Sequence, residues 1–214
     1  MKNKLISGII SAALILSPIA AHANHYVTVD GKMLDNRVYV PIRETGEQLG
    51  AKISWNQKTK TAVIQKDGNQ LVAKVGPYVK ILDGRVYVQL REVNDTFFDH
   101  DPIGWSSSHL MASNNHFYVS VAPLETSTAL KLASASISNK KERAELVEKA
   151  NGAELTGELT WEGFNKFKVN YSVEWKTGDY SYRTGNIEIK LKRSGEKWIP
   201  YSYQYDESWG VIVP

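Results

Sequence analysis

Apolar and polar residues alternate along the last third of the chain. Between Leu155 and Trp161 every second residue is apolar or glycine, and the residues between them are Thr or Glu. The same alternation covers four stretches: 155–161, 168–176, 187–192 and 201–205. A period of two with one polar face is typical of a half-exposed antiparallel sheet. Turn residues at 162–163, 177–179 and 194–196 separate the stretches, so the pattern predicts a curved four-stranded meander.

Helical segments precede this sheet. Residues 139–152 read as a helix that is capped by Ser138 or Asn139 and ends at Gly152. The Ser/Thr/Ala-rich segment 126–137 is either a linker or an earlier helix, and its apolar residues favour a helix. Helices covering an antiparallel sheet give the α+β class, and the layout is similar to NTF2-like or cystatin-like domains.

The first half contains an internal repeat. Residues 37–44 read Arg-Val-Tyr-Val-Pro-Ile-Arg-Glu and residues 85–92 read Arg-Val-Tyr-Val-Gln-Leu-Arg-Glu, so six of eight positions are identical at an offset of 48. A turn pair precedes each copy, Asp35-Asn36 and Asp83-Gly84, and Asp-Gly is a strong hairpin signal. Each unit is therefore predicted as strand, turn, strand, short helix, strand, turn, strand.

The two units differ in the helix. In the first unit an amphipathic stretch, 42–49, is followed by Gly50 as a C-cap and by an alternating strand that ends at Trp55. Trp105 corresponds to Trp55 in the second unit, but residues 94–98 interrupt the helical pattern. We therefore expect a degraded helix in the second unit.

These residues resemble the copper amine oxidase N-terminal-like domain, also called a stalk domain. The resemblance covers roughly residues 26–122 and rests on nine positions of the repeated motif: Arg37, Tyr39, Pro41, Arg43, Trp55, Arg85, Tyr87, Arg91 and Trp105. The second copy departs from the motif, with Gln89 in place of proline. The resemblance implies an antiparallel sheet wrapped on a helix, and an accessory module of secreted and surface proteins of Gram-positive bacteria without copper chemistry.

The Arg-Glu pairs of the repeat, 43–44 and 91–92, have two interpretations. Each arginine lies where a helix begins after a strand and can tie repeat elements together. We expect a buried or half-buried structural ion pair, with ligand binding as the alternative.

The N-terminal segment has the layout of a secretory signal. Lys2 and Lys4 precede an apolar run, which is followed by Ala21-His22-Ala23, an A-x-A cleavage site. The alternative is a membrane anchor, but the run is shorter than the roughly 20 residues that span a bilayer. We expect domains at 1–23 (signal peptide), 24–123 (stalk-type domain) and 124–214 (α+β domain). The mature protein is expected to be secreted, without a transmembrane anchor and associated with the cell wall.

Charge and cysteine content exclude several classes of function. The chain contains 26 Lys and Arg against 23 Asp and Glu, and loss of the two signal lysines lowers the formal net charge from +3 to +1. No concentrated basic stripe is present, so nucleic acid is not an expected partner. The absence of cysteine in the chain excludes disulfides, thiolate nucleophiles and Cys-ligated metal sites.

Candidate metal and catalytic groups are sparse. Asp99-His100-Asp101, with His109 and His116, is a candidate for Zn²⁺ or Mn²⁺ ligation, and a polar loop is the favoured alternative. The carboxylates Glu158, Glu162 and Glu174 are candidates for glycan hydrolysis, but the alternation places them on the solvent face, where cross-strand charge pairs explain them. No catalytic residue, metal or cofactor is expected.

Aromatic residues gather near the C-terminus. If they line one concave surface, they would form a site for a sugar, a peptide or an amphipathic ligand; sheet core is the favoured alternative. The candidate ligand-binding residues are Trp198, Tyr201, Tyr203, Tyr205 and Trp209.

Three functions fit these patterns. The first is a secreted, non-catalytic module whose repeat half attaches to the wall or surface and whose second half binds a ligand or partner, either a cell-wall polymer or an extracellular protein. The second is a protein inhibitor of an extracellular hydrolase. The third is a small NTF2-like enzyme, which requires an acid/base pair inside the hollow of the sheet.

Overall fold

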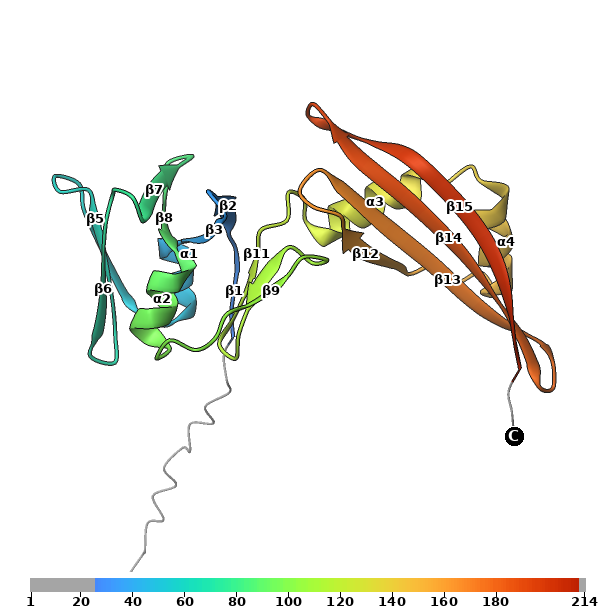
Figure 1. Cartoon of the computed structure of the whole chain (residues 1–214), viewed down its shortest axis with the longest axis horizontal. Coiled ribbons are helices and arrows are strands. Elements are labelled where there is room, and N and C mark those ends of the chain that lie inside the picture. Colours follow the sequence, from blue (N-terminus) through green and yellow to red (C-terminus); the bar gives the residue numbers. More distant parts are fainter. Residues whose placement is uncertain (1–25, 212–214) are drawn as a thin grey trace, which may run out of the picture.

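The chain forms two halves that lie side by side along the long axis of the molecule (Figure 1). The computed structural model describes residues 26–211. The predicted signal peptide, 1–23, lies outside the described residues. Within 26–211 no helix has the length and apolar composition needed to cross a membrane.

The first half consists of two units with the same order of elements. The first unit is a hairpin, a helix and a three-stranded meander: β2 (Lys32–Leu34), β3 (Arg37–Pro41), α1 (Ile42–Gln48), β4 (Lys52–Asn56), β5 (Thr61–Lys66) and β6 (Asn69–Lys74). The second unit repeats this order: β7 (Val79–Leu82), β8 (Arg85–Gln89), α2 (Leu90–Phe97), β9 (Gly104–Ser106), β10 (Met111–Ser113) and β11 (Phe117–Ser120). A preceding strand, β1 (Val27–Asp30), pairs in parallel with β11. The structure confirms the predicted order and adds one strand to each unit.

The hairpin turns form as their residues predict. Asp35 and Asn36 have φ of 49° and 58°, and Asp83 and Gly84 have φ of 49° and 74°. Two successive positive φ angles define the type I′ turn, which matches the twist of the flanking strands and favours Asn, Asp and Gly.

The two units pair with each other through their repeated strands. Strands β3 and β8 are antiparallel, with Val40 opposite Val88, Tyr39 opposite Gln89 and Pro41 opposite Tyr87. At the offset of 48, Val40 faces its own counterpart, and the pair Tyr39–Gln89 corresponds to the pair Tyr87–Pro41. The register is therefore symmetric about the Val40–Val88 pair. The repeat therefore produces a pseudo-twofold arrangement of the two units, with both valines buried at its centre.

The expectation of a degraded second helix is wrong. Helix α2 has eight residues, one more than α1. The residue that interrupts the pattern, Asn94, is buried, and both ends of its side-chain amide are hydrogen-bonded. Its Nδ2 donates to the carbonyl oxygen of Asp101 (3.0 Å) and its Oδ1 accepts from Nδ2 of Asn114 (2.8 Å). A buried amide with satisfied hydrogen bonds is compatible with a helix that packs on the core.

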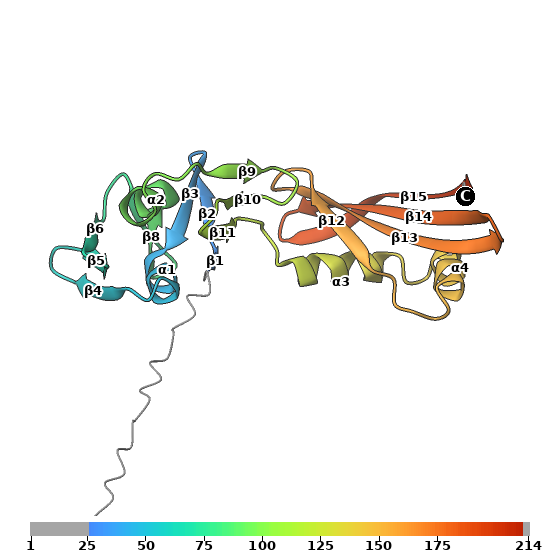
Figure 2. The same ribbon diagram turned by 90° about the horizontal axis from the view of Figure 1, so that it is seen from below.

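The second half is a four-stranded antiparallel sheet covered on one face by two helices, as seen edge-on in Figure 2. Its elements are α3 (Thr126–Ser136), α4 (Lys141–Lys149), β12 (Gly157–Trp161), β13 (Lys166–Gly178), β14 (Ser181–Ser194) and β15 (Lys197–Val211). The strands follow one another in chain order. The α+β class, the meander and the helix over 126–137 are confirmed.

Helix α4 begins two residues later than predicted. Its N-cap is Lys140, without a side-chain cap bond, so the predicted cap at Ser138 or Asn139 is wrong. The Ser138 hydroxyl instead donates to the carbonyl oxygen of Ala135 (2.9 Å), at the end of α3. A hydroxyl used at the end of one helix is not free to cap the next.

The inner face of this sheet forms the core of the second half. Phe167, Val169, Ile187 and Ile189 are buried there, beneath the helices. Leu146 of α4 packs over Gly185, where an added Cβ would lie 2.5 Å from the leucine side chain. Glycine at this position therefore sets the close approach of α4 to the sheet.

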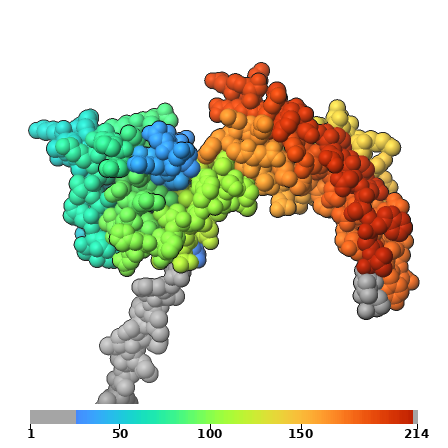
Figure 3. Space-filling view, in the orientation of Figure 1, coloured from blue at the N-terminus to red at the C-terminus, as the bar shows by residue number. Residues whose placement is uncertain are grey.

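The halves meet where the turn between β9 and β10 reaches the end of β12. The backbone N–H of Trp161 donates to the carbonyl oxygen of Ser108 (2.7 Å). Figure 3 shows the yellow-green residues of the second unit at the junction of the first half with the second.

One buried group in α1 leads to a stability prediction. The Thr45 hydroxyl is buried without a hydrogen-bond partner, and the equivalent residue of the second unit is Val93. Thr45→Val is expected to raise the free energy of unfolding by about 1 kcal/mol, because it removes an unsatisfied buried hydroxyl and keeps the side-chain shape. Urea denaturation measures the change, with the exposed-site variant Thr126→Val as control. A loss of stability in Thr45→Val would contradict the prediction.

Candidate functional site

The five aromatic residues predicted to bind a ligand do not share one surface. Trp198 packs at one end of the core, with ring centroids 5.9 Å from Trp161 and 5.1 Å from Phe167. Trp209 lies toward the other end of the long strands, 70 % exposed, with the Arg183 guanidinium 5.0 Å from its ring centroid. The prediction that Tyr201–Trp209 line one hollow is therefore wrong in its geometry, and ligand binding by these residues stays a prediction.

A β-bulge separates Tyr201 from the tyrosines that follow it. Ser202 pairs with Lys190 and Pro200 pairs with Leu191, so Tyr201 is an extra residue in β15. Its hydroxyl donates to Oε2 of Glu162 (3.4 Å), on the face away from the helices. Because proline lacks the N–H needed for a regular ladder, the bulge falls at Pro200 and reverses the face of Tyr201.

Tyr203 faces the N-terminal end of α4. Its hydroxyl donates to Oε2 of Glu142 (3.1 Å), and Lys140 Nζ lies 4.7 Å from its ring centroid. Burial, and then this bond to a carboxylate, raise the pKa of Tyr203 to about 12. The neighbouring Tyr205 donates to Glu207, and burial followed by that bond raises its pKa as well. Both tyrosine hydroxyls are therefore protonated at neutral pH and donate their hydrogen bonds in that state.

Alkaline pH should weaken the Tyr203 contact. The pKa of Tyr203 rises from 10.0 to about 12 on folding, so its contribution to stability is complete below pH 10 and is lost as pH rises toward 12. In Tyr203→Phe the decline in unfolding free energy between pH 10 and 12 is expected to be shallower than in the wild type. Denaturant midpoints across this range measure it, with Tyr180→Phe, 62 % exposed, as control. Parallel declines in wild type and Tyr203→Phe would contradict the assignment.

The carboxylates considered for hydrolysis lie on the outer face of the sheet. Glu158 and Glu174 are exposed, and Glu162 lies 3.8 Å from Lys190. Glu188 on the same face is 3.3 Å from Lys168 and 3.2 Å from Lys190. Of the three predicted carboxylates only Glu162 has an ion pair among the described residues, so the interpretation as charge pairs is supported for Glu162 and stays a prediction for Glu158 and Glu174.

The Asp99–Asp101 segment is a turn that follows α2. Asp99 and His100 both have positive φ (49° and 60°), His100 Nδ1 lies 2.9 Å from Asp95, and His116 Nε2 lies 3.2 Å from Asp101. Within residues 26–211 no three potential metal-ligating side chains come together. This geometry fits the polar-loop interpretation.

The repeated motif residues divide into buried and exposed sets. Tyr39, Pro41 and Tyr87 are buried and structural; the exposed set comprises Arg37, Arg43, Trp55, Arg85, Arg91 and Trp105. Among the described residues, no carboxylate lies within 4.0 Å of either helix-start arginine, so the predicted Arg-Glu ion pairs are wrong. Because both arginines are exposed, their guanidinium groups are free for contacts outside their own unit.

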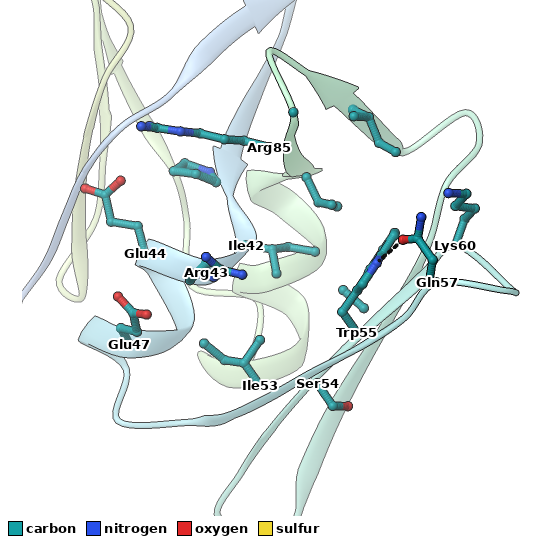
Figure 4. Close-up of a pocket in the computed structure, with 15 residues that line it drawn as sticks. Ile42, Arg43, Glu44, Glu47, Ile53, Ser54, Trp55, Gln57, Lys60 and Arg85 are labelled. Atoms are coloured by element: carbon teal, nitrogen blue, oxygen red, sulfur yellow. Dashed lines mark hydrogen bonds between the residues drawn. The ribbon is translucent and has the colours of Figure 1, made fainter.

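The exposed set lines two grooves. Groove A, of about 590 Å³, lies between the first unit and the β7–β8 hairpin of the second. Its lining includes Ile42, Arg43, Glu44, Glu47, Ile53, Trp55, Gln57, Lys60, Ile81, Arg85 and Val86. Figure 4 shows Ile42 and Arg43 between Arg85 on one side and Trp55 on the other, and the Trp55 Nε1–H donates to Oε1 of Gln57 (2.8 Å). Aromatic, aliphatic and charged groups thus converge in an open hollow of the size used for ligands.

Groove B, of about 830 Å³, repeats groove A with the roles of the units exchanged. Its lining includes Met33, Arg37, Val38, Leu90, Arg91, Glu92, Ile103 and Trp105. Each of these has its counterpart in groove A: Ile81, Arg85, Val86, Ile42, Arg43, Glu44, Ile53 and Trp55. The symmetric pairing of β3 with β8 explains why both grooves form. Groove B has in addition Phe164, from the turn that joins β12 to β13 in the second half.

Sequence reasoning found the residues of these grooves but not the grooves themselves. The sequence predicts a structural role for the motif positions, because nothing in it says which residues of one unit face the other. The signal that points to them is the repetition of Arg-Glu and Trp, which are polar or large side chains, at equivalent positions of both units.

Residues 22–121 match the family model described as copper amine oxidase N-terminal domain. The match confirms the stalk-domain resemblance of the first half, and this domain is not the catalytic domain of such enzymes. The match ends before α3, so the NTF2-like or cystatin-like resemblance of the second half stays a prediction. No curated protein and no solved structure matches the chain.

Proposed function

We propose that the chain is a secreted, non-catalytic module that attaches to the cell wall through groove A, with a wall polymer or an extracellular protein as its partner. The observation that supports this most is the exposed Trp55, 39 % accessible, in the same open groove as Arg43, which has no carboxylate within 4.0 Å among residues 26–211. Tryptophan and arginine are the side chains most enriched among residues that dominate binding energy.

The lining of groove A favours binding over catalysis. Its charged side chains are exposed or half-buried, so none is desolvated as catalytic acids and bases commonly are. The carboxylates considered for hydrolysis, Glu158, Glu162 and Glu174, lie on the outer face of the sheet. This position gives no support to the NTF2-like enzyme, which needs an acid/base pair inside the hollow.

Retention on isolated cell-wall sacculi tests the proposal. Residues 24–214 are incubated with sacculi and washed with salt, alongside Trp55→Ala and Trp209→Ala as a matched control at the far end of the second half. We expect the wild type and Trp209→Ala to be retained, and retention of Trp55→Ala to fall at least tenfold, or about 1.4 kcal/mol.

The other outcomes are equally informative. Loss of retention in Trp209→Ala alone would transfer binding to the second half, as the aromatic residues there first suggested. Absence of retention for the wild type would contradict attachment to the wall, and secreted hydrolases in the culture medium would then be tested as partners, including for inhibition.

A further inference from the structure

We infer that groove B is a binding site for an oligosaccharide, whose sugar rings stack on the aromatic side chains of Tyr78, Trp105 and Phe164. Groove B is separate from groove A, so this inference goes beyond attachment through groove A and does not depend on it. It follows from what distinguishes two grooves that the pseudo-twofold arrangement makes equivalent in position.

Groove B is lined by three aromatic side chains, and groove A by one. Trp105 on β9 is the counterpart of Trp55, whereas Tyr78, just before β7, and Phe164, in the turn between β12 and β13, add to it. All three are exposed, Tyr78 by 53 %, Trp105 by 46 % and Phe164 by 39 %. Large apolar side chains left exposed around one hollow mark a site for a ligand or partner, and about 830 Å³ is a size that ligand sites have.

These aromatic rings have no stacking partner within the described part of the chain. None of the three packs against another aromatic ring or lies beneath a cation, as Tyr201 lies beneath two lysines. The indole N–H groups also differ between the grooves. The Trp55 Nε1–H donates to Gln57 (2.8 Å), whereas the Trp105 Nε1–H has no partner among residues 26–211. Both the ring and the N–H of Trp105 are therefore available to a ligand.

The polar side chains of groove B suit the hydroxyl groups of a sugar. Arg37 and Arg91 are exposed and Glu92 is half-buried, and no ion pair joins any of them to another residue of 26–211. The guanidinium groups donate, the carboxylate accepts and the amide of Asn36 does both. A pyranose ring presents an apolar C–H face for an aromatic ring together with hydroxyls that donate and accept. The combination of aromatic rings and mixed polar groups therefore favours an oligosaccharide.

Two other kinds of ligand fit groove B less well. A peptide that adds a strand to a sheet needs a long free strand edge, but β2 and β9 have three residues each, and β3 and β8 are paired on both sides. A strongly anionic polymer needs a concentration of positive charge. The charged residues that line groove B are two arginines and one glutamate.

The test titrates two oligosaccharides into the ¹⁵N-labelled chain, residues 24–214, and follows the indole N–H signals by NMR. Chitotetraose is the neutral probe and tetragalacturonate the acidic one. We expect the Trp105 signal to shift with at least one of them and the Trp55 signal to stay. Tighter binding of tetragalacturonate would in addition assign Arg37 and Arg91 to its carboxylates. Absence of a Trp105 shift with both probes would overturn the inference.

Three variants locate the binding site. By isothermal titration, Trp105→Ala and Phe164→Ala should each weaken oligosaccharide binding about tenfold or more. Trp55→Ala, the equivalent change in groove A, is the matched control and should bind as the wild type does. Because Phe164 lies in an exposed turn, its variant gives a result even if Trp105→Ala does not fold. Weakened binding in Trp55→Ala, with wild-type binding in Phe164→Ala, would overturn the assignment to groove B.

Two further results separate the alternatives. A Trp105 shift with a tryptic digest of casein, and none with the oligosaccharides, would assign groove B to peptides and overturn the inference. Retention on sacculi that is lost in Trp55→Ala, without any oligosaccharide binding, would support attachment through groove A and overturn the inference for groove B. Oligosaccharide binding that depends on Trp105, without retention on sacculi, would support the inference and contradict wall attachment.

Discussion

Replacing Phe167 with alanine is expected to lower the free energy of unfolding of the second half by about 3–5 kcal/mol. The side chain is fully buried, and its ring centroid lies 5.3 Å from that of Trp161 and 5.1 Å from that of Trp198. The substitution therefore removes apolar burial and leaves a cavity between two indoles. Urea denaturation followed by tryptophan fluorescence measures the loss directly.

Phe164→Ala is the matched control for this change. It makes the same chemical substitution three residues away, at a side chain that is 39 % exposed and contributes to groove B. We expect it to cost less than about 1 kcal/mol of unfolding free energy, because little burial is lost. Equal losses in the two variants would contradict the assignment of Phe167 to the core.

Replacing Tyr39 with alanine is expected to destabilise the first half by a similar amount, about 3–5 kcal/mol. Tyr39 is 1 % exposed on β3, next to the pseudo-twofold centre. Its hydroxyl donates to the carbonyl oxygen of Pro77 (3.2 Å) and accepts from Nε2 of Gln89 (2.9 Å), so the side chain joins the two units. The loss therefore combines a cavity with two broken hydrogen bonds.

The repeat provides an internal comparison for the hydroxyl of Tyr39. Tyr39→Phe should cost about 1–3 kcal/mol, because it leaves the buried Gln89 amide without its acceptor. Tyr87→Phe, at the equivalent position of the second unit, should cost less, since the Tyr87 hydroxyl makes no hydrogen bond with any of residues 26–211. Thermal unfolding of the two variants measures both losses of stability. A larger loss in Tyr87→Phe would contradict the assignment of the hydrogen bonds to the Tyr39 hydroxyl.

The features that sequence patterns predict correctly are those set by local chemistry. The alternation after Leu155 predicts the meander, and the turn pairs before each copy of the motif predict the hairpins. In both cases the signal lies within a few residues: a period of two for a half-exposed sheet, and Asn, Asp or Gly for positive φ. These signals predict two hairpins in each unit, and the structure adds a fifth strand to each.

The predictions are wrong where contacts between residues distant in the sequence determine the local structure. Asn94 disrupts the helical pattern, yet partners at 101 and 114 satisfy its amide, so α2 continues. A bulge at Pro200 turns Tyr201 to the opposite face from Tyr203, which divides the predicted aromatic surface. The helix-start arginines are exposed in the grooves between the units, where no carboxylate of the described residues lies within 4.0 Å of them.

The candidate site follows from the repeat but only through its symmetry. Trp55 and Trp105 are recognisable in the sequence as equivalent positions. Whether they face the core or a groove depends on the pairing of β3 with β8, which no local pattern encodes. The structure therefore changes their role from structural to surface residues of grooves A and B.

The order in which strands are paired also bears on how the chain folds. In the second half each strand pairs with its neighbour in sequence, so its sheet grows by closing short turns. In the first half Val27 on β1 is opposite Phe117 on β11, and the sheet is complete only after a loop of about 90 residues is closed. Because folding slows as contacts become less local, the half that is synthesised last has the topology that folds first.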